Sequence, residues 1–295
     1  MGYIDKNVAD TNVLSGMLPE EIATVCNLPQ QFQSVQIFQW IARGCTSFAE
    51  MTNLPLKERE RLASVYTPRN TVCETVLKDP DGTVKLGIGL YDGSSIETVL
   101  LFDKHERRTA CVSCQVGCPM GCTFCQTGQL GCLRNLSPNE IVEQFLHLEK
   151  ICGKLDNIVF MGMGEPLLNL DSIAKTIAVL THPKGRNLSH RRITLSTSGI
   201  CKGIYELAER QLDIRLAVSL TTADEALRTT LMPVTKANPL SELKKAIRYF
   251  NDKTDKRVTL ELALLKDVNT SYKAAQQVRD FAEGLNVHIN LIPWN

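Results

Sequence analysis

The stretch Gly117–Thr127 reads GCPMGCTFCQT and places three cysteines, Cys118, Cys122 and Cys125, within eight residues of one another. Three thiolates so close together can hold a metal. A structural zinc site uses four ligands and usually shows a second Cys or His pair at comparable spacing. No such pair follows here, because the histidines and the other downstream cysteines are scattered on separate segments.

An iron–sulfur cluster fits the spacing better than zinc. Three thiolates can hold three irons of a [4Fe-4S] cluster and leave the fourth iron open to an exogenous ligand. An open iron implies chemistry on a substrate or a cofactor. Two other interpretations remain open: a zinc or ordinary redox cluster, and three buried cysteines that pack as small hydrophobic residues.

The composition is that of an ordinary soluble protein. The chain has 295 residues, 43% of them hydrophobic and 22% charged, with a formal net charge of +1. No apolar run reaches the roughly 18 residues of a membrane span, and the N-terminus lacks a secretory signal, so we predict a cytoplasmic protein with no membrane partner. In a reducing compartment, 11 cysteines favour metal or thiol chemistry over a disulfide framework.

Three segments differ in their hydrophobic pattern. Residues 1–66 predict a small helical domain, since apolar residues recur there at three- and four-residue spacing. Residues 67–106 alternate polar and apolar positions around the turns DPDGT and DGS, which predicts three antiparallel strands, VCETVLK, VKLGIGLY and IETVLLF. Residues 107–295 alternate six apolar strand-like runs, from TACVSCQV to VHINLIP, with five amphipathic helices.

The alternation in residues 107–295 predicts a parallel βα array, either an open doubly wound sheet or an incomplete barrel. Ligands gather in such folds at the carboxyl ends of the strands. The three cysteines are expected in a loop of this kind, directly after the first strand TACVSCQV.

The loop CPMGCTFC resembles the C-x3-C-x2-C signature of radical S-adenosylmethionine (SAM) enzymes, with Phe124 as the aromatic residue before the third cysteine. Further blocks narrow the resemblance to the adenine C2-methyltransferases of ribosomal and transfer RNA (RlmN and its Cfr relatives): CVSCQVGC, TGQLGCLRNL, GMGEPLLN, RRITLSTSG and NLIPWN. The N-terminal FQSVQIFQWI and TSFAEMTNLP resemble that family's helical accessory domain. The resemblance implies an α/β fold, a partial (β/α)6 radical SAM barrel with a small N-terminal helical domain and a short antiparallel β extension.

The resemblance also implies roles for particular residues. Cys118, Cys122 and Cys125 would hold one [4Fe-4S] cluster, whose open iron takes the amino and carboxylate groups of SAM. Two residues would have catalytic roles: Glu97 as proton acceptor and Cys111 as the thiol that resolves a covalent RNA adduct. The remaining matches are SAM contacts: Gly164, Glu165, Ser196, Ser219, Leu220, Thr221 and Asn295.

The chain departs from the family pattern at three positions. Thr221 stands where a histidine is expected, and Cys114 and Cys132 stand where the family has a serine and an aromatic residue. The family also continues beyond NLIPWN into a segment with a methyl-accepting cysteine. Without it we expect SAM cleavage without methyl transfer.

The implied activity is radical methylation of C2 of adenine in 23S rRNA, tRNA or both. The implied partners are RNA and an electron donor such as flavodoxin or ferredoxin, and the chain is expected to act as a monomer. Two alternatives remain open: a radical SAM protein that cleaves SAM without methylating RNA, and an iron–sulfur RNA-binding module.

Overall fold

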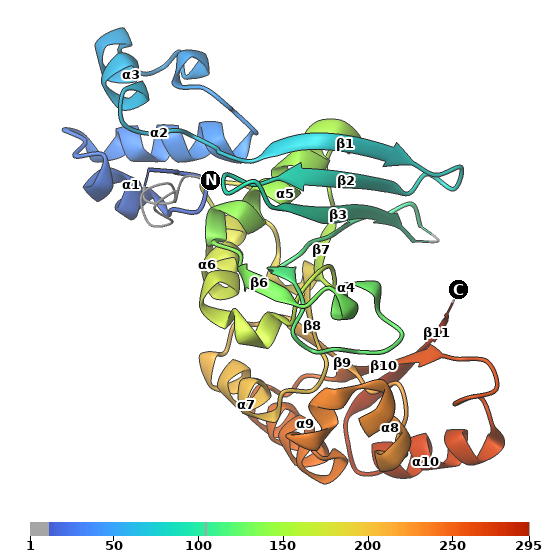
Figure 1. Cartoon of the computed structure of the whole chain (residues 1–295). Coiled ribbons are helices and arrows are strands. Elements are labelled where there is room, and N and C mark those ends of the chain that lie inside the picture. The colour runs from blue at the N-terminus through green and yellow to red at the C-terminus, as the bar shows by residue number, and fades with distance from the viewer. Residues whose placement is uncertain (1–11, 104, 295) are drawn as a thin grey trace.

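A single sheet of nine strands organises the protein (Figure 1). The computed structural model describes residues 12–103 and 105–294. The strands are hydrogen-bonded in the order β1-β2-β3-β4-β7-β8-β9-β10-β11. They are β1 (Val72–Lys78), β2 (Val84–Gly89), β3 (Ser95–Phe102), β4 (Arg108–Cys111), β7 (Asn157–Phe160), β8 (Ile193–Thr197), β9 (Arg215–Ser219), β10 (Val258–Leu264) and β11 (Val287–Pro293).

The six strands from β4 to β11 are parallel, and each pairs with the strand that precedes it in this series. A doubly wound sheet would reverse its strand order at a switch point. This sheet does not, so the partial (β/α)6 barrel is confirmed and the doubly wound alternative is wrong. The helices of this part are α5 (Pro138–Cys152), α6 (Leu170–Thr181), α7 (Cys201–Arg210), α8 (Glu225–Leu231), α9 (Leu240–Thr254) and α10 (Tyr272–Ala282).

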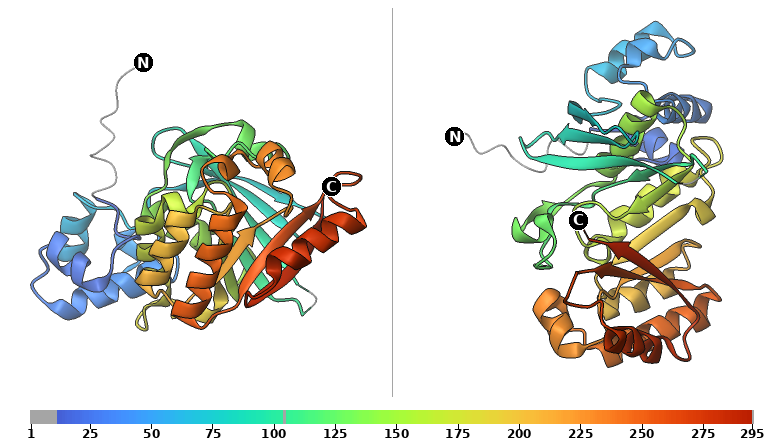
Figure 2. Two further views of the ribbon diagram at one scale, coloured as in Figure 1. Left: turned by 90° about the horizontal axis from the view of Figure 1, so that it is seen from below. Right: turned by 90° about the vertical axis from the view of Figure 1, so that its right-hand side faces the viewer.

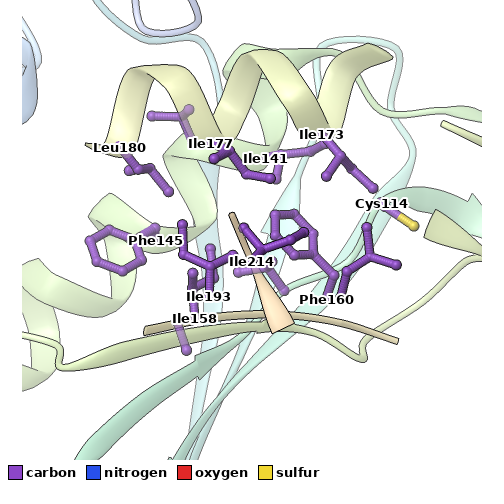
Figure 3. Packing of buried hydrophobic residues seen from close by; sticks show 14 of the residues in the cluster. Cys114, Ile141, Phe145, Ile158, Phe160, Ile173, Ile177, Leu180, Ile193 and Ile214 are labelled. Atoms are coloured by element: carbon purple, nitrogen blue, oxygen red, sulfur yellow. The ribbon is translucent and has the colours of Figure 1, made fainter. Parts of the chain in front are cut away.

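The helices cover one face of the parallel strands (Figure 2). Helix α5 begins at the sequence SPNE, where Ser137 and Glu140 form a capping box with Pro138 in the first turn. Its apolar face packs with that of α6 against β7 and β8 (Figure 3). The core residues shown there include Ile141, Phe145, Ile158, Phe160, Ile173, Ile177, Leu180 and Ile193, all of them buried.

The three antiparallel strands extend the barrel sheet. Strand β1 pairs with β2 and β2 with β3, as the alternating pattern predicts. Strand β3 then pairs with β4, with Val99 opposite Cys111. The extension is therefore part of the same hydrogen-bonded ladder as the barrel.

The N-terminal part is helical, as predicted, with α1 (Pro19–Val25), α2 (Gln31–Ala42), a 3-10 turn η1 (Phe48–Glu50) and α3 (Leu56–Ala63). A buried carboxylate joins this part to the barrel. Glu143 of α5 accepts hydrogen bonds from the Ser15 hydroxyl at 2.6 Å and from the Thr71 backbone N–H at 2.8 Å. Burial of a charged group is tolerated only when its oxygens are paired in this way.

The predicted strand TACVSCQV is wrong as a single element. Strand β4 ends at Cys111, and the chain then crosses the end of β7, where the Cys114 N–H donates to the Met163 carbonyl at 2.8 Å. A second short strand, β5 (Gln115–Gly117), pairs with β6 (Cys132–Asn135) in a separate two-stranded sheet. An apolar run cannot show by itself that two halves of it join different sheets.

Several short elements beside the barrel were not predicted, among them α4 (Gln126–Gln129), helix α8 and the 3-10 turn η4 (Pro233–Lys236). They are too short for a clear hydrophobic period. Across residues 12–103 and 105–294, no helix is long and apolar enough to cross a membrane.

Candidate active site

A pocket of about 260 Å³ lies at the carboxyl ends of the parallel strands. The chain reaches it from the cysteine loop, here defined as residues 118–125, and from the ends of β7, β8, β9, β10 and β11. Most of the predicted cofactor residues line this one pocket: Cys118, Cys122, Cys125, Gly164, Glu165, Ser196, Ser219 and Thr221. Leu220 is buried beside it, and Asn295 lies outside the described residues.

The cysteine loop is held by backbone hydrogen bonds at both ends. Cys118 N–H donates to the Gly131 carbonyl at 2.7 Å, and Thr123 N–H donates to the Leu231 carbonyl at the end of α8 at 2.9 Å. Burial, with a smaller contribution from the neighbouring sulfurs of Cys125 and Cys118, raises the pKa of the Cys122 thiol to about 12. A cationic ligand is therefore needed to keep these sulfurs as thiolates at neutral pH.

The residues present fit a cluster better than a single metal ion. In the described part of the chain, no three His, Cys, Asp or Glu side chains converge closely enough to hold one ion. The three cysteines nevertheless share one pocket and supply only sulfur ligands, which is the donor set of a [4Fe-4S] cluster.

Gly164 and Glu165 follow β7 at the centre of the pocket. The Glu165 carboxylate is 2% exposed and accepts three hydrogen bonds: from Leu167 N–H at 3.1 Å, Ser198 N–H at 2.7 Å and the Ser198 hydroxyl at 2.7 Å. The Thr197 side chain is a further hydrogen-bond partner, so a cationic ligand would bind this carboxylate mainly through its charge. Burial raises the pKa of Glu165, and a bound cation would oppose that shift.

Gly164 is required by its backbone and by its neighbours. Its φ is 110°, and a Cβ there would lie 2.7 Å from Cys114 Sγ and 2.8 Å from Gln115 Cβ. Cys114, one of the departures from the family pattern, is thus a buried packing residue behind the site (Figure 3). Cys132, the other, is exposed on β6.

Replacing Gly164 with alanine should lower the free energy of unfolding by more than the strain of a positive φ alone would. Overpacking of a core typically costs about 1 to 3 kcal/mol, added here to the strain of a positive φ. Gly93→Ala is the matched control, because Gly93 has φ 80° but open space around it. Urea unfolding should show the larger loss for Gly164→Ala; equal losses would contradict the steric explanation.

Thr221 occupies a strained position at the pocket. It is a β-branched residue with φ 60°, a rare conformation for such side chains. Its N–H and that of Leu220 both donate to the Glu261 carbonyl, at 3.1 and 3.0 Å. Strained backbone of this kind is most often found at functional sites.

Glu97 and Cys111 do not line the pocket. Glu97 is exposed on β3 and forms an ion pair with Lys85 at 2.9 Å. Burial raises the pKa of the Cys111 thiol to about 11, so the thiol is protonated at neutral pH. The two residues share one face of the sheet, since Val99, two residues after Glu97, lies directly opposite Cys111.

Sequence reasoning missed several pocket residues. Ser198, two residues beyond the predicted Ser196, is the serine that binds Glu165. Glu261 lines the pocket from β10, where Asn290 Nδ2 donates to one of its oxygens at 2.6 Å. The second oxygen has no hydrogen-bond partner among the described residues, so it can accept from a ligand hydroxyl or amino group. The alternation TLELAL places Glu261 on the inner face, but only the structure shows the pocket there.

Comparison with known proteins identifies the family of this chain. A family model described as the radical SAM superfamily matches residues 112–275, and one described as the ribosomal RNA large subunit methyltransferase N-terminal domain matches residues 28–67. A "Probable dual-specificity RNA methyltransferase RlmN" from Treponema pallidum is 61% identical over 96% of this chain and 83% of its own length. Its Treponema denticola counterpart is 65% identical over 96% and 81%. The chain belongs to the RlmN family.

The RlmN family assignment extends to the fold. The crystal structure of a radical SAM methyltransferase from Sphaerobacter thermophilus superimposes with a TM-score of 0.90, at 37% identity, covering 98% of this chain and 85% of that one. The protein is thus a radical SAM RNA methyltransferase, with a [4Fe-4S] cluster and SAM as cofactors and RNA as substrate. The predictions of family, fold, cofactors and an RNA partner are confirmed.

Proposed function

We propose that the protein methylates C2 of adenine in ribosomal and transfer RNA. One observation carries the proposal: a single pocket unites the three cysteines with Gly164, Glu165 and the strand-end residues that resemble the SAM contacts of the family. The dual specificity named for the relatives supports both RNA classes. We also propose that residues 1–66 form an accessory RNA-binding domain, residues 67–106 a β extension and residues 107–295 the radical SAM core.

Each residue of the pocket has a distinct task in this proposal. Cys118, Cys122 and Cys125 hold the cluster. Glu165 binds the SAM ammonium, because a buried carboxylate that lines the pocket favours a cationic donor. When bound, the cluster and SAM supply radical chemistry, which methylation of an electrophilic carbon requires. The remaining contacts to SAM are proposed for Ser196, Ser219, Leu220, Thr221 and Asn295.

Glu97 and Cys111 act on the RNA adduct rather than on SAM in this proposal. Their shared face of the sheet, outside the SAM pocket, supports that division. Glu97 accepts the proton lost from C2. Cys111 loses its proton and attacks the sulfur of the family's methyl-accepting cysteine, which carries the adduct. A disulfide forms, the carbon–sulfur bond breaks, and the electron pair goes to the carbon, which takes up a proton to become the methyl group. The raised pKa of Cys111 means that a base must act first.

The proposal also includes an electron donor, an oligomeric state and a location. An electron donor such as flavodoxin or ferredoxin supplies electrons, and the protein acts as a monomer in the cytoplasm, where its RNA substrates are found.

The product of the reaction tests the proposal. The protein would be incubated anaerobically with SAM, dithionite and unmodified ribosomal RNA or tRNA, and the digested RNA analysed by mass spectrometry. We expect 2-methyladenosine from protein that carries the family's methyl-accepting cysteine, and none in the absence of dithionite. Formation of 8-methyladenosine by that protein, or of 5'-deoxyadenosine without any methylated base, would contradict the proposal.

A further inference from the structure

Arg228 is a cation enclosed by neutral groups. It lies on α8, its side chain is 0% exposed, and its guanidinium joins the ends of β8 and β9 to the turn η4. Each hydrogen-bond partner is a carbonyl or a hydroxyl. The acceptors are the Leu220 carbonyl at 3.0 Å, the Ser198 carbonyl at 2.7 Å, the Ser219 carbonyl at 3.0 Å and Thr235 Oγ1 at 2.7 Å.

No carboxylate pairs with this charge. Among the described residues, no Asp or Glu forms an ion pair with Arg228. Glu225, on the same helix, accepts instead from Leu240 N–H at 3.0 Å. Burial lowers the pKa of Arg228 to about 10, which still leaves it charged at neutral pH. A buried charge without a counter-ion is costly, so an anion is expected nearby.

The cysteine loop, whose sulfurs can supply that anion, is attached to the helix that carries Arg228. Leu231, three residues after Arg228 on the same helix, accepts from Thr123 N–H, and Thr123 directly follows Cys122. Among the groups that attract the Arg228 charge, the Cys122 sulfur contributes most, followed by Glu225 and then Cys201. The same helix thus fixes both the guanidinium and the loop whose three sulfurs become thiolates when they bind iron.

We propose that Arg228 is the buried counter-cation of the iron–sulfur cluster and makes that cluster easier to reduce. The proposal rests on the assignment of Cys118, Cys122 and Cys125 as cluster ligands. One-electron reduction by an external donor adds one negative charge and changes no bond in the protein. Arg228 stabilises that added charge, and the effect is large in a site of low dielectric constant. The net charge around a cluster is one of the factors that set its reduction potential.

Arg228 is also a positioning residue. Its bond to the Ser198 carbonyl fixes the residue that binds Glu165, and its bond to the Ser219 carbonyl fixes the next strand end. A test must therefore separate charge from hydrogen bonding. Arg228→Lys keeps the charge but loses most of the bonds, whereas Arg228→Gln keeps an amide donor and loses the charge. Thr235→Val removes an acceptor from the same network without changing any charge.

The reduction potential of the reconstituted protein is the measurement. An anaerobic redox titration without RNA would follow the electron paramagnetic resonance signal of the reduced cluster. We expect the Arg228→Gln potential to shift to more negative values, and those of Arg228→Lys and Thr235→Val to stay close to the parent. A parent-like potential in Arg228→Gln, or an equal shift in Arg228→Lys, would overturn the proposal.

If a variant binds too little cluster for a redox titration, its iron content is measured instead. If Arg228→Gln binds no iron while Arg228→Lys binds as much as the parent, the charge requirement is supported. If both lose iron equally, hydrogen bonding alone explains the residue and the proposal fails. Because RNA is absent throughout, these outcomes do not depend on which adenine carbon is methylated.

Discussion

Cys122→Ala should remove the iron–sulfur cluster. Anaerobic reconstitution of the parent protein should give about four irons and four sulfides per chain, and the variant close to none. Three thiolates already leave one iron open, so a cluster held by two has no protein ligand for half of its irons. Cys122 is also buried, and its neighbour Thr123 is fixed to α8 by a backbone hydrogen bond. Iron and sulfide analysis with visible absorption measures the loss.

Cys132→Ala is the matched control for this experiment. Cys132 lies on β6, close to the cysteine loop in the sequence, but it is exposed and does not line the pocket. Its loss should leave the iron content unchanged. Stoichiometric zinc in the parent protein, without cluster absorption, would show that the donor set was misread. An iron requirement for Cys132 equal to that for Cys122 would show that the ligands are not the three proposed.

Glu165→Ala should weaken SAM binding at least tenfold while the cluster survives. Hydrogen bonds to charged groups contribute about 1.5 to 3 kcal/mol, and about 1.4 kcal/mol corresponds to a factor of ten in affinity. The variant loses the carboxylate proposed to bind the SAM ammonium, and it releases Ser198 from two hydrogen bonds. Calorimetric titration of the reconstituted protein with SAM measures the affinity.

Glu143→Gln is the control for the loss of a buried carboxylate. Glu143 is also buried and multiply hydrogen-bonded, but it lies on α5 outside the pocket. Its substitution should reduce stability without changing SAM affinity. If Glu165→Ala binds SAM as tightly as the parent, Glu165 is a structural residue of the β7 turn and not a ligand of SAM.

Local sequence patterns predicted a helix or strand correctly where a single hydrophobic period continues through that element. Alternating residues predict β1, β2 and β3, although β1 contains a register shift between Cys73 and Thr75, and SPNE marks the start of α5. The pattern failed at TACVSCQV, where a continuous apolar run leaves one sheet at Cys111 and enters another at Gln115. That change depends on contacts with the ends of β7, which no local pattern contains.

The site was predictable to the extent that its residues are adjacent in the sequence. The three cysteines and the GMGEP turn are short motifs, and the structure brings them together as expected. Arg228 was not predictable, because an arginine in a short helix normally suggests an exposed side chain. Its buried position depends on the carbonyls of Ser198 and Ser219, which lie 30 and 9 residues earlier in the chain.

The continuous sheet from β1 to β11 limits where residues can be inserted or deleted during evolution. Glu97 and Cys111 share a face only because β3 and β4 keep their register, with Val99 opposite Cys111. Inserting one residue between Glu97 and Val99 would turn the glutamate to the helix-covered side, because side chains alternate along a strand. The same insertion in the turn at 92–94 would leave that pairing intact. Insertions and deletions should therefore accumulate in this hairpin turn and be eliminated from β3.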